Sequence, residues 1–184
     1  MAFFFFDFQD IRKQDARALL SSLIVQLSNQ SDHFYDILLR FHSIHHGMQQ
    51  PTVHALTQCL EDMVRASRDV PIYLIVDAID ECSNTTGMPS SRDQVLSLLE
   101  ELVNLNLPSL RLCATSRPEI DIWTSLEPLT STYTCVSLHE QSGQRNDIDD
   151  FVRAVVYSDK NMRRWRDEDK KVVIKTLSER ADGM

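Results

Sequence analysis

The sequence predicts an α/β fold in which helices cover both faces of a parallel sheet, so that the domain has three layers. Short apolar runs of strand length alternate with longer segments in which apolar residues recur at helical spacing. Alternation of this kind requires parallel strands joined by right-handed helical crossovers. The chain has 184 residues, which is enough to bury the core of one such domain.

Three short apolar runs are predicted to be the strands of the sheet. Residues 2–8 form an almost uninterrupted aromatic run, the pattern of a strand that is buried on both faces. Residues 72–77 are apolar and β-branched and are predicted to form a central strand. Residues 110–116 form the next strand, which Arg117-Pro118 closes. A further strand is predicted over residues 132–138.

Helices are predicted wherever apolar residues fall on one face at helical spacing. These segments lie around residues 16–27, 34–41, 53–64, 91–103, 148–155 and 173–181. Ser91 and Gln94 have the spacing of a capping box at the start of the fourth of these helices.

Charge and composition exclude several classes of protein. The formal net charge of −8 disfavours general binding to nucleic acid, which depends on clustered Lys and Arg. The four cysteines form no C-x-x-C pair, so we expect reduced thiols in a cytoplasmic protein without a structural zinc site. No apolar stretch approaches the roughly 18 residues of a membrane span, and the aromatic start lacks the basic region of a signal peptide. We therefore expect no nucleic-acid or membrane partner.

Carboxylates gather where the second predicted strand ends. Asp77, Asp80 and Glu81 follow one another within five residues, and ligands of open α/β sheets bind outside the carboxyl ends of the strands. Mg²⁺ prefers oxygen ligands and keeps several waters, so one or two carboxylates together with phosphate oxygens suffice to bind it. The alternative is structural: Asp77 caps a turn, and Asp80 and Glu81 begin a solvated loop.

A cation follows the next strand, at the same predicted edge of the sheet. Thr115, Ser116 and Arg117 end this strand, and the planar guanidinium of an arginine matches the geometry of a phosphate. The two strand ends together favour a site for a phosphorylated ligand over an isolated acidic turn.

The sequence resembles a known family. The pairing of IYLIVDAIDEC with LRLCATSRPE, after an FFFFDF strand and helical segments, is similar to NACHT-type (STAND-class) signal-transduction NTPases, especially the nephrocystin-like and fungal NLR-like group. The resemblance covers nearly the whole chain. It implies a three-layer parallel sheet of the P-loop NTPase type. Residues 1–140 would be part of a nucleotide-binding core, and residues 141–184 would start the helical segment that follows.

The resemblance also implies roles for the residues at the two strand ends. Residues 72–81 match the Walker B strand, with Asp77 as the carboxylate that holds Mg²⁺. Asp80 and Glu81 match the catalytic pair that positions or activates the attacking water. Residues 110–117 match the sensor strand, in which Arg117, beside Thr115 and Ser116, contacts the nucleotide. The implied cofactors are Mg²⁺ and ATP or GTP.

The sequence departs from this family in one large respect. It contains no G-x-x-x-x-G-K-[ST] loop, whose backbone N–H groups cradle phosphates. We therefore expect both ends of the chain to be cut, in a fragment, a truncated gene product or a degenerate paralogue, with a sheet that is incomplete at the N-terminal strand. A gap is then expected beside the acidic strand, and exposed strand edges would favour association with another copy or another chain.

Two functions remain open on these grounds. The first is a fragment of a NACHT-type nucleotide-binding signalling switch, from a parent family that hydrolyses ATP or GTP. The second is a non-catalytic interaction or scaffold fragment that keeps an α/β core, since the missing loop removes most phosphate contacts. Whether the chain is an enzyme stays open at this stage.

Overall fold

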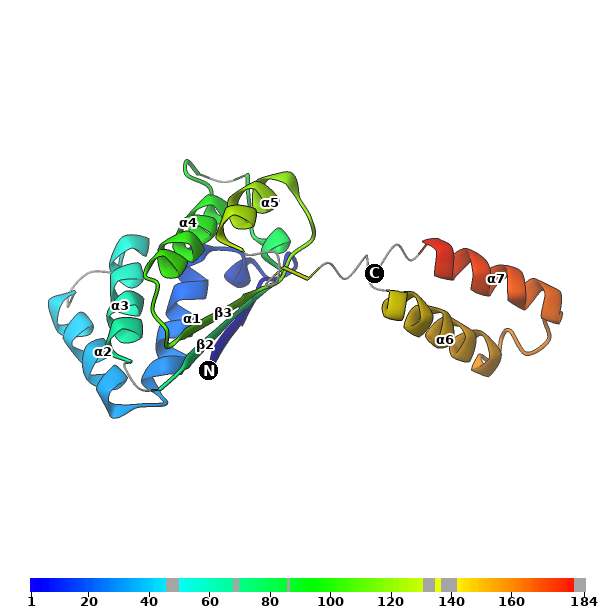
Figure 1. Cartoon of the computed structure of the whole chain (residues 1–184), viewed down its shortest axis with the longest axis horizontal. Coiled ribbons are helices and arrows are strands. Elements are labelled where there is room, and N and C mark those ends of the chain that lie inside the picture. Colours follow the sequence, from blue (N-terminus) through cyan, green and yellow to red (C-terminus); the bar gives the residue numbers. More distant parts are fainter. Residues whose placement is uncertain (46–49, 68–69, 86, 131–134, 137–141, 181–184) are drawn as a thin grey trace. The chain divides into compact units, whose positions relative to one another are not determined.

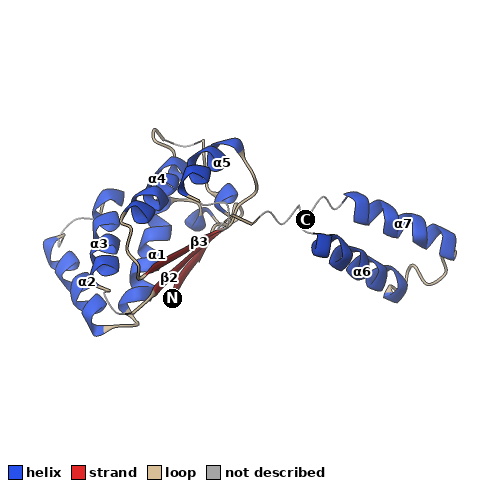
Figure 2. Cartoon of the chain, viewed as in Figure 1, coloured by secondary structure: helices blue, strands red, loops and turns tan. Residues whose placement is uncertain are grey.

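A computed structural model describes residues 1–45, 50–67, 70–85, 87–130, 135–136 and 142–180. The chain forms two compact units, Met1–Thr130 and Ser131–Met184. Figures 1 and 2 show the strands in the first unit and two helices in the second. The predicted strand over residues 132–138 lies outside the described residues except for positions 135–136, and the predicted domain boundary after residue 140 stays a prediction.

The first unit is built on a parallel sheet. Its strands are β1 (Ala2–Phe5), β2 (Ile72–Asp77) and β3 (Leu110–Ala114), in the order β1-β2-β3. Leu74 of β2 is in register with residues of both neighbouring strands. The predicted α/β class, the parallel pairing and the central position of the acidic strand are confirmed.

The strand order corrects one prediction, the gap beside the acidic strand. β2 pairs along its length with β1 on one side and with β3 on the other. No gap therefore lies next to Asp77 in the described sheet. The outer edges of this sheet belong to β1 and β3 instead.

Glutamine side chains cover the outer edge of β1. They come from the end of helix α1 (Ala16–Ser28) and the turn after it. Gln26 accepts a hydrogen bond from the N–H of Phe3 at 3.1 Å and donates to its carbonyl at 2.7 Å. Gln30 donates to the carbonyl of Met1 at 2.8 Å. These side chains satisfy backbone groups that a neighbouring strand would otherwise pair.

The helices of the first unit lie on one side of the sheet (Figure 1). Both crossovers, β1 to β2 and β2 to β3, move in the same direction, and right-handed crossovers then put their helices on the same face. Burial follows this arrangement, since Phe4 is 8% exposed and Phe5 is 48% exposed. The prediction that the aromatic strand is buried on both faces is wrong: the described unit has two layers.

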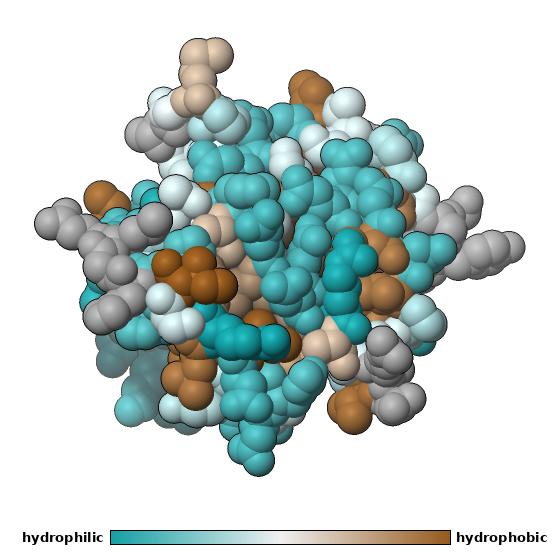
Figure 3. Space-filling view, turned by 90° about the vertical axis from the view of Figure 1, so that its left-hand side faces the viewer, coloured by the Kyte–Doolittle hydropathy of each residue, from teal (hydrophilic) through white to brown (hydrophobic). Residues whose placement is uncertain are grey.

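The hydrophobic core lies between the sheet and helix α1. Helices α2 (Asp32–Ile44) and α3 (Val53–Ala66) contact α1, as does α4 (Ser91–Asn104). The largest fully buried side chains are Leu19, Leu20, Leu23, Ile24, Leu27, Leu60, Met63, Val64, Leu74, Ile79, Leu99 and Leu102. The surface at the end of the unit that carries α2 and α3 is largely hydrophilic (Figure 3). Helices α2 and α3 therefore expose a hydrophilic outer surface, while Leu60, Met63 and Val64 of α3 belong to the core.

Helix α4 begins one residue earlier than its predicted capping box. Ser90 is the N-cap, and its hydroxyl accepts a hydrogen bond from the N–H of Asp93 at 3.1 Å. The Asp93 carboxylate accepts in return from the N–H of Ser90 at 3.0 Å. Hydrogen bonds from Ser90 hold the pKa of Asp93 below its usual value. Because two serines are adjacent, the sequence offers the same spacing twice, and the structure uses the pair that ends in Asp93 instead of Ser91 and Gln94.

Helix α5 (Ile120–Leu126) was not predicted. It is short, and Ile122 is its one buried residue, so its sequence shows no helical period. A 3-10 turn, η3 (Glu127–Leu129), follows it. The other predicted helices of this unit are confirmed within a few residues of their expected ends.

The second unit is a hairpin of α6 (Ser142–Ser158) and α7 (Asp167–Arg180), as the two predicted helices there indicated. The hydroxyl of Ser178 donates to Asp149 at 3.1 Å and joins the two helices. The ammonium of Lys170 lies 5.2 Å from the centroid of the Tyr157 ring. In the described parts of the chain, no helix combines the length and the apolar character needed to cross a bilayer.

Candidate functional site

The carboxyl ends of the parallel strands bring the predicted site residues to one edge of the sheet. Asp77 is the last residue of β2. Asp80 and Glu81 lie in a 3-10 turn, η2 (Ile79–Glu81), that begins two residues later. Residues 115–117 follow directly after β3. Hydrogen bonds connect the two strand ends, so the predicted juxtaposition is present in the structure.

Thr115 fixes the end of the acidic strand. Its hydroxyl donates to Oδ1 of Asp77 and accepts from the N–H of Ala78 at 3.1 Å. Its backbone N–H donates to Val76 at 3.0 Å, and its carbonyl accepts from Ile79 at 3.1 Å. The side chain and backbone of this residue therefore hold the Asp77 carboxylate and the turn after it in one position.

The turn after Asp77 contains a strained residue. Ala78 has φ 57° and ψ 49°, the left-handed conformation that residues other than glycine rarely adopt. Such a conformation costs on the order of 1 kcal/mol or more and persists where surrounding contacts over-determine it. The bonds from Ala78 and Ile79 to Thr115 are such contacts. No glycine marks this position, so the sequence gives no signal of it.

Asp80 holds Arg117. One oxygen of Asp80 accepts from the backbone N–H of Arg117 at 3.0 Å, and the other lies 3.5 Å from its Nε. The Asp80 side chain is 9% exposed, whereas that of Arg117 is 73% exposed. The Ser116 hydroxyl donates to the carbonyl of Arg117. A buried carboxylate thus anchors a cation whose guanidinium is accessible to solvent and to ligands.

Glu81 connects the site to the segment that follows the first strand. Its Oε2 accepts from the N–H of Phe8 at 3.0 Å. Gln14 adds a second link. Its side-chain amide donates to the backbone carbonyl of Phe8 at 2.6 Å, and its backbone carbonyl accepts from the thiol of Cys82 at 3.3 Å. The loop that carries Asp80 and Glu81 is therefore attached to the rest of the fold at several points.

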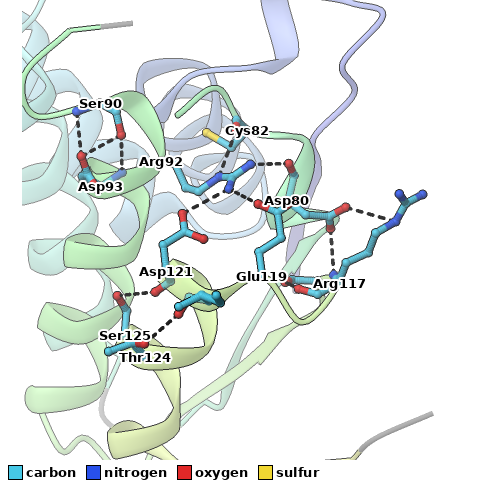
Figure 4. A network of polar contacts seen from close by, with 12 residues as sticks. Asp80, Cys82, Ser90, Arg92, Asp93, Arg117, Glu119, Asp121, Thr124 and Ser125 are labelled. Atoms are coloured by element: carbon cyan, nitrogen blue, oxygen red, sulfur yellow. Dashed lines mark hydrogen bonds and ion pairs between the residues drawn. The ribbon is translucent and has the colours of Figure 1, made fainter. Parts of the chain in front are cut away.

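Sequence reasoning missed Arg92, which lies behind this edge (Figure 4). Its side chain joins the loop after β2 to Glu119 and Asp121, which begin α5. Burial of the guanidinium opposes its charge, but the hydrogen bonds to these two carboxylates outweigh burial and raise the pKa of Arg92 above its ordinary value. One signal could have found it: an arginine in the first turn of a helix, where the dipole disfavours a cation.

The side chains at the carboxyl edge of the sheet determine which metal ion this edge can bind. Within the described ranges, no group of three or more His, Cys, Asp or Glu side chains could hold a metal ion by itself. A single carboxylate such as Asp77, completed by waters and phosphate oxygens, is nevertheless the kind of site that Mg²⁺ uses. The edge thus fits Mg²⁺ that arrives with a phosphorylated ligand and does not form a cage made of protein groups alone.

The reactivity of the Cys82 thiol tests whether the loop after β2, which carries Asp80 and Glu81, keeps this thiol buried. Burial raises the pKa of Cys82 to about 12, while Cys113 is exposed on β3. Because the thiolate is the reactive form, iodoacetamide at about pH 8 should alkylate Cys113 and leave Cys82 intact. Peptide mass mapping over time measures both rates. Alkylation of Cys82 at the rate of Cys113 would show that the loop opens in solution.

Comparison with known proteins gives one family. The sequence model of the family described as Nephrocystin 3, N-terminal, matches residues 1–117. This range spans well over half of the 184 residues and runs from the first strand through Arg117, so it contains the whole edge described above. No curated protein and no solved structure matches the chain.

Proposed function

This chain belongs to the Nephrocystin 3, N-terminal family, and we propose that residues 1–117 form the metal-binding part of a NACHT-type nucleotide-binding signalling switch. One observation carries the proposal: Asp77 and the Asp80–Arg117 pair meet at the ends of adjacent parallel strands, linked by Thr115. Carboxylates for a divalent cation and an accessible guanidinium for a phosphate are the two donor types that a metal–nucleotide complex requires.

Asp77 and Thr115 act together in this proposal. Asp77 binds the Mg²⁺ that accompanies ATP or GTP, directly or through a water, and Mg²⁺ neutralises phosphate charge when it is bound. Thr115 donates to Oδ1 of Asp77 and so orients the carboxylate. Ser116, whose hydroxyl donates to the carbonyl of Arg117, stabilises the turn that presents this arginine.

Asp80 and Glu81 have the catalytic role in the proposal. Both lie in η2, close to the end of the acidic strand, and each carboxylate has two oxygens that can accept hydrogen bonds from water. The bond from Phe8 engages Oε2 of Glu81. A carboxylate that is held in this way can position an attacking water and accept its proton.

Arg117 provides the difference between the two states of the switch. In the structure its guanidinium pairs with Asp80 through Nε. A terminal phosphate presents more charge than one carboxylate and accepts two parallel hydrogen bonds from a guanidinium. Asp80 keeps the Nε and the backbone N–H of Arg117, and the terminal Nη groups then bind the phosphate. A ligand shifts an equilibrium only through contacts that differ between the states, and this added contact is such a difference.

Charge makes the binding depend on the metal. Asp77, Asp80 and Glu81 repel a polyphosphate, and the sequence lacks the glycine-rich loop that would cradle it. A divalent cation converts this repulsion into attraction. We therefore expect binding of ATP or GTP only when Mg²⁺ is present.

The test is calorimetric titration of the chain with ATP and with GTP, each with Mg²⁺ and with EDTA. Asp77→Asn should weaken binding by at least about tenfold, because loss of a metal ligand costs no less than loss of a group that orients one. Asp36→Asn, on the exposed face of α2, is the matched control and should bind like the wild type. Equal affinity of the Asp77→Asn and Asp36→Asn variants would remove the proposed metal site.

A second candidate function is a non-catalytic scaffold that associates through its sheet. The observation that favours it is the uncovered sheet face, on which Phe3, Phe5 and Tyr73 are each nearly half exposed. Apolar patches of this kind mark interaction surfaces. Absence of any nucleotide binding by the folded chain, together with self-association in sedimentation velocity that Phe5→Ser abolishes, would favour this function over the switch.

A further inference from the structure

A buried arginine lies directly behind the proposed site. Arg92 is the second residue of α4, and only 4% of its surface is exposed. The positive end of the helix dipole disfavours a cation at this position, and burial of a charge adds a further cost. An arginine is therefore retained here only because its contacts outweigh both effects.

Those contacts connect two loops (Figure 4). On one side, Nε of Arg92 donates to the carbonyl of Cys82 at 3.1 Å, and Nη2 donates to the carbonyl of Asp80. On the other side, Nη1 donates to Glu119 and, at 3.1 Å, to Asp121. The planar guanidinium thus joins the loop after β2 to the start of α5, and no shorter or more flexible cation can reach all four groups in the same geometry.

The contact with Asp80 leads to the site itself. Arg92 holds the backbone of Asp80, while the side chain of the same residue holds Arg117 through its Nε and its backbone N–H. Arg117 is also two residues before Glu119, which Arg92 binds. The segment 117–119 is therefore restrained at both ends, once through Asp80 and once through Glu119.

We infer that Arg92 is a positioning residue of the phosphate site: it fixes the Asp80 backbone and Glu119, and thereby sets where Asp80 holds the guanidinium of Arg117. Arg92 itself is buried and does not contact the ligand. Its consequence for binding rests on the proposed function, whereas its effect on Arg117 can be measured without any ligand.

The first measurement uses the free protein. In a sample labelled with ¹⁵N-arginine, the Nε–H signal of Arg117 is assigned through Arg117→Lys. Arg92→Lys keeps the charge but loses the planar guanidinium. The Nε–H signal of Arg117 should therefore move toward the position of a solvated arginine, and its proton should exchange faster with water. Asp80→Asn should cause the same change, and the double variant should add nothing further, because both act through one contact.

The second measurement is affinity for magnesium pyrophosphate, followed by calorimetry. Arg92→Lys should weaken it about tenfold, the usual effect of removing a group that orients a ligand-binding residue. The control is Arg153→Lys, which alters an arginine–aspartate pair of 2.8 Å in the second unit. It should change neither the Arg117 signal nor the affinity.

The outcomes separate the two proposals. An Arg117 signal that moves in Asp80→Asn but not in Arg92→Lys overturns the positioning role and leaves the switch intact. A signal that moves in both, in a protein that binds no pyrophosphate, supports the positioning role and removes the phosphate site. An affinity that falls while the Arg117 signal stays unchanged also overturns the inference.

Discussion

Phe4→Ala should lower the free energy of unfolding by about 3 kcal/mol or more, and Phe5→Ala by less than about 1 kcal/mol. The two residues are neighbours in β1 and carry the same side chain. Phe4 faces the helices and is 8% exposed, whereas Phe5 faces the uncovered side and is 48% exposed. Urea unfolding at several protein concentrations measures both values.

The pair of variants also tests whether another molecule covers the bare face. A cost for Phe5→Ala as large as that for Phe4→Ala would show that this face is buried in solution. If a second copy buries it, the unfolding midpoint of the wild type will rise with protein concentration.

Arg92→Met should destabilise the first unit by about 3 kcal/mol. The change removes the donors to the carbonyls of Asp80 and Cys82 and leaves Glu119 beside Asp121 without a cation. The cost falls at the low end for a broken buried ion pair, because both carboxylates are partly exposed and water can solvate them.

The electrostatic origin of this cost can be tested by also removing the two carboxylate charges that Arg92 neutralises. Adding Glu119→Gln and Asp121→Asn to Arg92→Met should recover part of the lost stability, because like charges then no longer face each other. Arg153→Met, at an exposed pair, should leave the unfolding midpoint unchanged. A triple variant less stable than Arg92→Met would contradict the electrostatic explanation.

The sequence was sufficient for the three described strands and for their parallel direction. The sequence of strand β2 is apolar and β-branched, and its acidic end lies at the edge where open α/β sheets generally bind ligands. The aromatic run of β1 was misleading in one respect, because consecutive phenylalanines fit burial on one face or on both. The direction of the crossovers decides between these alternatives, and this direction depends on strand order. For the same reason the sequence predicted a gap beside β2, where the described sheet has none.

The candidate site also contains residues that the sequence predicts and residues that it does not. Asp77, Asp80 and Arg117 could be found because they follow strands directly, so local sequence determines where they lie. The left-handed Ala78 and the Arg92 contacts depend on partners far along the chain, and no spacing rule connects them. Helix α5, which begins just after Glu119, was missed because one buried residue produces no period.

Gln26 and Gln30 make the two edges of the sheet unequal. Gln26 and Gln30 occupy the backbone groups of Met1 and Phe3, so an incoming strand would have to displace them before it could pair there. The outer edge of β3 is not paired with any described strand. An added strand would therefore meet free backbone groups beside β3, next to the turn that carries Arg117. Such a strand would lie on the same flank of the first unit as the proposed site.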